Sequence, residues 1–429
     1  MMTDDRIVLY YPNIMPEETA RAFLENRRRA LEFVEDFLHV ELEKPLTILI
    51  HVSLISSSER AAYFKEPTVE YSLPYSWLQR IPYPFGNGTA VHEVVHIVAH
   101  NEWAPTLSLF LGEGMAVALD FLSRPSRVVD PHLFTSGLML LNASMSLDEL
   151  FSIRFRYSLT ASEALLNLYY EGASFVLFLI DQFGLQKLRQ LHRVSWMPIS
   201  MLKEEFCRIY GEELARVEGD WLGFLQGYAV GHEVRAKRVV QAMFDFSDRI
   251  VGALRELEEY WSKFAFELVS LSEKVSNEYG ILTSLLTTLG CFSEEGMTCD
   301  EADEAYEAFE RTLTAVESSL MLWLNAIQMF ESVLNLISDI PDYEDLITKI
   351  EEAQTLYRQV GDGGMVTRTM EYITAFRHLQ QGEAAIMDGD HDLAQHSLSM
   401  ALSLFSKLNE QGTIRHVKRL LELSRHVVN

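Results

Sequence analysis

Apolar and polar positions alternate in two ways along this chain. In its first part, short apolar runs rich in β-branched and aromatic residues predict strands at residues 6–11 and 46–52, and a further extended piece at 68–73. Between the first two runs, apolar residues recur at helical spacing and predict a helix over residues 17–40. From Thr89 onward the pattern is helical again, after a segment rich in Pro, Tyr and Gly.

Beyond about residue 230 the strand pattern disappears. Long amphipathic runs dominate, and Pro341 is the last proline of the sequence. This pattern is typical of helices packed against one another. A chain of 429 residues is also long enough for two hydrophobic cores. We therefore predict an α+β domain over residues 1–228, followed by an all-helical domain over residues 229–429.

A repeat is visible near the C-terminus. Similar segments begin at Ala353 and at Ala401, each with a leucine and an aromatic residue in the next turn. Small residues stand between them at Gly382, Ala385, Gly389 and Ala394. Their spacing resembles that of tetratricopeptide helix pairs, which stack to bury a core that one pair cannot bury alone. A generic helical bundle is the alternative.

Charge narrows the range of partners. The net charge is −26, which argues against nucleic acid, because phosphate binding needs clustered Lys and Arg. Residues 294–310 carry eight acidic side chains and no basic one, a pattern that predicts an acidic loop or a solvated helix face. The hydrophobic content of 48% and the charged content of 23% are ordinary for a soluble globular protein.

Several features predict a cytoplasmic protein. Cys207, Cys291 and Cys299 form neither a disulfide framework nor a metal-binding spacing, which fits a reducing compartment. The N-terminal residues are acidic, whereas a secretory signal begins with basic residues and continues with an apolar stretch. We expect no membrane segment either, since no window approaches the roughly 18 uncharged apolar residues that a spanning helix needs.

The sequence His92-Glu93-Val-Val-His96 lies inside an apolar helical stretch and carries the clearest chemistry. Histidines four residues apart lie on one helix face, so both imidazoles can meet one metal ion. Glu93 adjoins the first histidine, where it can reach a zinc-bound water without binding zinc itself. Zinc lowers the pKa of that water toward about 7, and the carboxylate takes its proton as it attacks a carbonyl.

Catalytic zinc normally has three protein ligands, so one more is needed. His100 lies on the same helix face but about 12 Å from His92 along the axis, too far to share one ion. A third histidine further along is excluded, because Glu102 occupies that position. The better candidate is Glu113, which follows a predicted turn, is flanked by glycines, and would need a cation if it were buried. A helix-capping role for Glu113 is the alternative.

Residues 89–122 resemble the metal-binding core of the gluzincin metallopeptidases. The pattern of that family is HExxH, a turn, and then a helix that contains Glu-Gly and a following Ala. The residues at these places are His92, Glu93, His96, Glu113, Gly114 and Ala116. The gap between His96 and Glu113 is slightly shorter than in thermolysin or the aminopeptidase-N-like enzymes. The resemblance implies a zinc peptidase with one Zn²⁺ per chain, held by His92, His96 and Glu113.

A second segment, residues 169–179, resembles the aminopeptidase-N-like sequence Tyr-x-Lys-Gly-Ala-Ser followed by an apolar helix. In that family the tyrosine hydrogen-bonds the oxyanion, a role for which a phenol is suitable. The resemblance assigns this role to Tyr169. Tyr170 is a rival, and a core aromatic residue is the other alternative. Glu171 stands where the family has Lys.

The upstream family sequence Gly-x-Met-Glu-Asn, whose Glu binds the free amino end of the substrate, is missing. Glu59 and Glu70 lie in the right region without that context. This favours an endopeptidase over an aminopeptidase, which stays an alternative. The substrate would be a protein or peptide, and the helical domain would recruit a substrate or a partner protein. Two further alternatives stay open. In the first alternative, the chain is a scaffold protein with a vestigial metal site. In the second, it is a peptidase that stays latent until a partner engages the helical domain.

Overall fold

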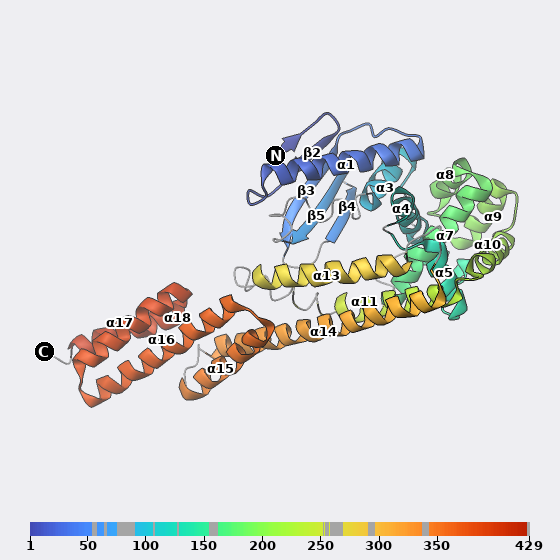
Figure 1. Cartoon of the computed structure of the whole chain (residues 1–429). Coiled ribbons are helices and arrows are strands. Elements are labelled where there is room, and N and C mark those ends of the chain that lie inside the picture. Colours follow the sequence, from blue (N-terminus) through green and yellow to red (C-terminus); the bar gives the residue numbers. More distant parts are fainter. Residues whose placement is uncertain are drawn as a thin grey trace. The chain divides into compact units, whose positions relative to one another are not determined.

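The structure is a computed structural model of the chain (Figure 1). It describes residues 1–53, 58–63, 67–74, 91–105, 108–126, 128–153, 162–251, 253, 257, 269–290, 297–336 and 343–426. In this part of the chain, one small mixed β-sheet is combined with many helices. The α+β class predicted from the sequence is confirmed.

The sheet contains five strands in the order β1-β2-β3-β5-β4. Their bounds are Met2–Thr3 for β1, Ile7–Tyr10 for β2, Leu46–Ser53 for β3, Ser58–Tyr63 for β4 and Pro67–Pro74 for β5. The strands β2, β3 and β5 are parallel, whereas β1 and β4 pair antiparallel at the two edges. The three predicted strands are thus confirmed as β2, β3 and β5. The edge strand β4 has no counterpart among the predictions, because its sequence contains no β-branched residue.

Helix α1 (Glu17–Leu38) connects the parallel strands β2 and β3. It places Phe23, Leu31 and Val34 in the core, where each is at most 1% exposed. The helix ends at His39, whose left-handed φ of 54° is common just after the end of a helix. The predicted helix over residues 17–40 is therefore confirmed, and its last two residues form the cap.

Helices make up the rest of the described chain. The first group consists of α3 (His92–Val98), η1 (Ala99–Trp103), α4 (Leu109–Ser123), α5 (Pro131–Leu140), α6 (Leu147–Ser152), α7 (Ser162–Phe183), α8 (Leu185–Val194), α9 (Ile199–Tyr210) and α10 (Leu214–Ala229). The second group consists of α11 (Glu233–Phe246), η3 (Ser247–Val251), α13 (Val269–Gly290), α14 (Cys299–Leu336), α15 (Tyr343–Val360), α16 (Gly363–Asp388), α17 (His391–Leu408) and α18 (Gln411–His426).

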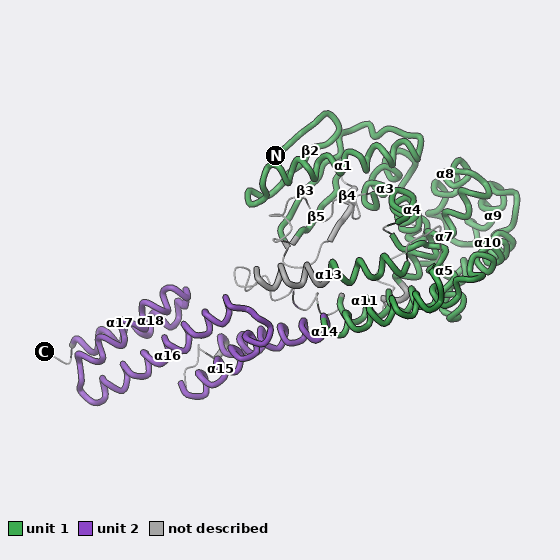
Figure 2. The backbone as a smooth tube through the Cα atoms, in the orientation of Figure 1, with its two compact units in different colours: residues 1–255, 272–315 green, residues 256–271, 316–429 purple. Residues whose placement is uncertain are grey.

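The chain forms two compact units, residues 1–255 with 272–315 and residues 256–271 with 316–429 (Figure 2). Helix α11, which follows residue 228, packs tightly against α5 within the first unit. A Cβ atom on Gly137 of α5 would lie only 2.2 Å from the carbonyl oxygen of Ala236 in α11. Helices that follow residue 228 therefore complete the core of the first unit.

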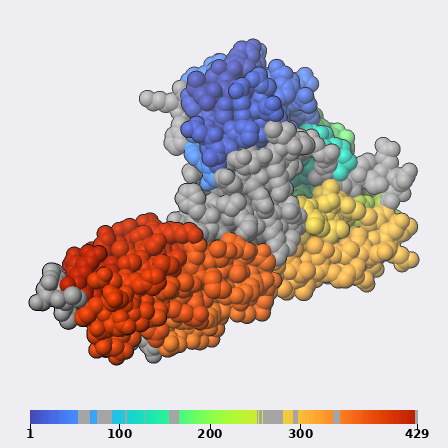
Figure 3. All heavy atoms as spheres, turned by 60° about the vertical axis from the view of Figure 1, so that its left-hand side comes forward, coloured from blue at the N-terminus to red at the C-terminus, as the bar shows by residue number. Residues whose placement is uncertain are grey.

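The second unit is entirely helical in its described residues. Helices α15 to α18 pack in sequence order and form one continuous surface (Figures 1 and 3). Short connections join them, with left-handed residues at Gly361, Gly389 and Asn409. A Cβ atom on Gly382 would lie 2.6 Å from Leu398, so a small residue is needed there, as the repeat pattern suggests. Assignment of these helices to the tetratricopeptide family stays a prediction.

The acidic segment 294–310 is described from residue 297 onward. Its residues from Cys299 belong to the first turns of α14, where Asp300, Glu301, Glu304 and Glu307 are exposed. This agrees with a solvated helix face. As for the membrane, none of the helices searched among the described residues has the length and apolar character needed to cross it.

Candidate metal centre

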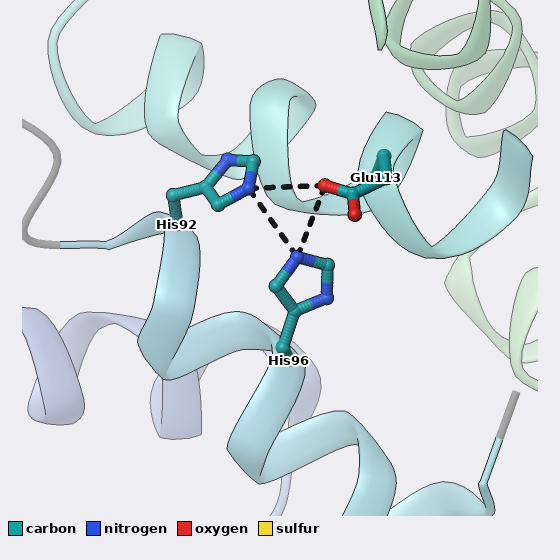
Figure 4. A group of neighbouring side chains, drawn as sticks. All are labelled: His92, His96 and Glu113. Atoms are coloured by element: carbon teal, nitrogen blue, oxygen red, sulfur yellow. Dashed lines mark hydrogen bonds and ion pairs between the residues drawn. The ribbon is translucent and has the colours of Figure 1, made fainter. Parts of the chain in front are cut away.

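The side chains of His92, His96 and Glu113 converge at one point (Figure 4). The Nε2 atoms of the two histidines are 3.3 Å apart. Glu113 Oε2 lies 3.2 Å from His92 Nε2 and 3.3 Å from His96 Nε2. The two histidines from one helix and the carboxylate from the next are thus brought together, as the sequence predicts.

The spacing of these donor atoms fits a small tetrahedral ion. Ligand bonds of about 2.0–2.1 Å at tetrahedral angles separate neighbouring donors by about 3.3–3.4 Å. The three observed distances therefore match one triangular face of such a tetrahedron. The side chains of His92, His96 and Glu113 are 18%, 12% and 10% exposed, so the group is largely shielded from water. This cluster can hold a metal ion.

The pKa values of His92 and Glu113 are shifted in opposite directions. Burial lowers the pKa of His92, but the hydrogen bond to Glu113 and the negative charges of Glu113, Glu93 and Asp120 outweigh it and raise the pKa to about 9. Burial acts in the opposite sense on Glu113, yet its hydrogen bonds to His92 and His96 hold its pKa far below the usual range. The cluster therefore favours an ionised Glu113 carboxylate beside a cationic group. A metal ion can take the place of the proton on His92, because it binds the neutral imidazole.

The helical periodicity of α3 places its apolar residues on one side and the two candidate metal ligands on another. Val94, Val95, Ile97 and Val98 are completely buried in the core. His92 and His96, one turn apart, keep partial exposure on another side of the same helix. The apolar residues anchor the helix, and the anchored backbone fixes the direction of both imidazoles.

Helix α4 is held against α7 by two glycines. A Cβ atom on Gly114 would lie 2.4 Å from the carbonyl carbon of Gly172, and one on Gly172 would lie 2.6 Å from the carbonyl oxygen of Phe110. Gly114 therefore lets the backbone of α4 approach that of α7 closely.

This crossing also brings Tyr169 to the site. Its ring lies 6.2 Å from the ring of His92 in an edge-to-face arrangement. Tyr170, the rival residue, instead packs on Phe134 of α5 with ring centroids 4.5 Å apart. Its carbonyl oxygen accepts a hydrogen bond from Thr135. Of the two candidates, Tyr169 is therefore the one that lies next to the cluster of His92, His96 and Glu113, and its assigned role stays a prediction.

The other candidate residues occupy separate places. Glu93 is half-buried on α3, between the two histidines in sequence. His100 belongs to η1 and is not part of the cluster, in agreement with the sequence argument. Glu70 lies on β5 outside the cluster, and the side chain of Glu59 lies outside the described part of the chain. Sequence reasoning missed Asp120, whose charge acts on His92; its position two helical turns after Glu113 was the available signal.

Glu171, which stands in place of the family's Lys, is completely buried. Its carboxyl group accepts hydrogen bonds of 3.0 and 3.3 Å from the backbone N–H of Met145. Burial raises its pKa well above the usual value, and the single N–H donor offsets this only in part. Glu171 therefore connects α7 to the segment that precedes α6, away from solvent.

Replacing Glu171 by glutamine should stabilise the protein at neutral pH. Because the pKa is raised in the folded state, the stability contributed by the protonated group is complete below the unfolded pKa of about 4.3 and is lost as pH rises through the folded pKa. Glutamine keeps the acceptor for Met145 but does not ionise. We expect the melting temperature of Glu171→Gln to exceed that of the wild type by an increasing margin from pH 5 to pH 8. Glu204→Gln, at an exposed position, is the control; a margin that is constant with pH would contradict this assignment.

Comparisons with known proteins add no further constraint. No protein-family model, no curated protein and no solved structure matched the chain.

Proposed function

We propose that this chain is a zinc metallopeptidase of the gluzincin type that cleaves within protein or peptide chains. The observation that carries the proposal is the convergence of His92, His96 and Glu113 on one point, with Glu93 between the two histidines in sequence. Two imidazoles and one carboxylate are a known donor set of catalytic zinc. A structural zinc site would normally have four protein ligands, and the cluster contains three among the residues that the structure describes.

The proposed chemistry is hydrolysis of an amide. When bound, zinc polarises the substrate carbonyl and lowers the pKa of water. Glu93 acts as general base, accepts a proton from the attacking water and passes it to the leaving amine. Tyr169 donates its phenolic hydrogen to the carbonyl oxygen as that oxygen gains negative charge. The proximity of Tyr169 and His92 supports this role.

The sheet suggests how an extended substrate is presented. Strand β4 is at one edge of the strand order and packs against α3, the helix that carries both histidines. An edge strand offers backbone N–H and C=O groups with which an extended peptide can pair. Such pairing recognises the peptide backbone and needs no free amino end. It therefore favours an endopeptidase, as does the missing Gly-x-Met-Glu-Asn sequence.

The helical second unit supplies a surface for recruitment in this proposal. Stacked helix pairs expose long faces that bind protein segments. We propose that α15 to α18 recruit a protein substrate or a partner. A cytoplasmic location and the absence of a nucleic-acid partner stay predictions from the cysteine content, the N-terminal residues and the net charge.

The function is tested with the variant Glu93→Gln. Zinc content is measured on purified protein, and cleavage is followed on an unstructured protein such as labelled casein and on a lysate proteome. We expect about one zinc per chain in both wild type and variant. Cleavage should be lost only in the variant, since glutamine cannot accept the proton from water. Glu204→Gln, an exposed Glu on α9, is the matched control and should retain both properties.

Two results would contradict the proposal. Cleavage retained by Glu93→Gln would remove Glu93 from its role. Wild-type protein without zinc at neutral pH would favour the scaffold alternative. A third result separates the latent peptidase from the constitutive one, namely bound zinc with cleavage only after a binding partner of the second unit is added.

A further inference from the structure

The helix that carries both histidines ends in a π-helical turn without a left-handed cap residue. Helix α3 continues directly into the π-helical turn η1, in which the N–H of Ala104 donates to the carbonyl oxygen of Ala99 at 3.1 Å. Ala104 itself is extended, with φ of 178°. Helices α1, α9, α16 and α17, in contrast, all end at a left-handed residue that helps to satisfy their last carbonyl groups. Among the described residues, the last carbonyl groups of η1 receive hydrogen bonds from another helix.

Helix α8 provides these donors. Arg193 Nε donates to the carbonyl oxygen of Trp103 at 3.2 Å, and Arg189 Nη2 donates to that of Glu102 at 3.4 Å. The guanidinium group of Arg189 also lies 5.7 Å from the ring centroid of Trp103. Positive charge near the C-terminus of a helix is favourable, because the last carbonyl groups carry partial negative charge.

A third residue of α8 completes the contact. His192 is 2% exposed, and its ring packs edge-to-face on Trp103 with centroids 5.7 Å apart. Neither of its ring nitrogens has a hydrogen-bond partner among the described residues. Burial lowers the pKa of His192 to about 4, so it is neutral and packs as an aromatic ring. Arg189, His192 and Arg193 have the spacing of one helix face.

We propose that these three residues of α8 are positioning residues of the metal centre. They hold η1 in place, and η1 continues the helix one turn beyond His96. Unwinding next to His96 would displace one of the three side chains that would hold the ion, and groups that orient metal ligands typically affect metal affinity by about 10–100-fold. The inference rests on the proposed metal site and adds to it an anchor contributed by a helix distant in sequence.

The test uses the full chain with both arginines replaced, Arg189→Ala with Arg193→Ala. Zinc affinity is measured by competition with a chelator, and amide hydrogen exchange is measured over residues 99–104. We expect zinc affinity to fall at least about 10-fold, as for other groups that orient metal ligands. Exchange over residues 99–104 should become faster, while exchange in the β-sheet stays unchanged. Arg208→Ala, which removes an exposed arginine of α9, is the matched control.

Conservative variants separate positioning from general stability. Arg193→Lys keeps a cationic donor and should recover part of the zinc affinity lost in Arg193→Ala. His192→Phe keeps a ring on Trp103 and should bind zinc as the wild type does. If the zinc affinity of the variant with both arginines replaced stays within twofold of the wild type, the inference is overturned. The proposed metal site would not be affected by that result. If the wild type itself does not bind zinc, the proposed function fails, and the inference fails with it.

Discussion

Replacing Gly172 by alanine is expected to lower the stability of the protein by about 3 kcal/mol, near the upper end of the range for overpacked cores. The added Cβ would lie 2.6 Å from the carbonyl oxygen of Phe110 and 3.0 Å from Cα of Gly114. Both are backbone atoms of α4, so no side-chain rotation relieves the contact. The helices must separate, which moves Glu113 on α4 away from Tyr169 on α7. Thermal unfolding should show a melting temperature several degrees lower, with weaker zinc binding.

The same substitution at Gly219 is the control for this experiment. Gly219 lies in helix α10, and an added Cβ would meet nothing within 4 Å. Alanine is a better helix former than glycine by about 1 kcal/mol, so Gly219→Ala should have an unchanged or higher melting temperature. Equal destabilisation by both variants would show that Gly172 is not in close backbone contact with α4.

Replacing Glu113 by glutamine is expected to reduce zinc affinity by more than about 100-fold, beyond the 10–100-fold effects of groups that only orient ligands. Glutamine preserves the shape of the side chain but removes the negative charge that faces His92 and His96 at 3.2 and 3.3 Å. The pKa of His92 should fall as well, because the hydrogen bond and charge that raise it come mainly from Glu113. Both changes are measurable, by chelator competition and by NMR titration of the zinc-free protein.

The variant Glu93→Gln distinguishes a ligand from a base in this experiment. It changes the same functional group one residue from His92 but should leave zinc affinity close to that of the wild type. If Glu113→Gln retains wild-type affinity, the carboxylate of Glu113 is not a ligand. If both variants lose zinc equally, Glu93 belongs to the ligand set, and its assignment as general base is wrong.

The local pattern of apolar residues was enough to predict the elements whose structure depends on neighbouring residues. The strands at residues 6–11 and 46–52 and the helix between them have apolar periodicities that match the observed β2, β3 and α1. The pairing of His92 with His96 is also local, because one helical turn places both rings on one side. Glu113 could also be predicted from the sequence, because it is a carboxylate flanked by glycines shortly after the turn.

Other features have no local signal. Apart from Tyr63, the edge strand β4 consists of residues that are not enriched in strands, and it pairs with β5 through the backbone. The partner of Gly114 cannot be identified from its neighbours, because a glycine indicates close approach but not to which helix. The packing of α11 on α5 joins helices far apart in the sequence and includes a close approach of Gly137 to Ala236.

The sequence by itself determined which residues can bind a metal and that two of them share a helix face, because periodicity follows from backbone geometry alone. Only the tertiary structure decided that α7 contacts Gly114 and brings Tyr169 to His92, and that arginines of α8 cap the helix after His96. Those contacts join segments far apart along the chain. Their energies come from steric fit and from hydrogen bonds between distant segments, which no short stretch of sequence records.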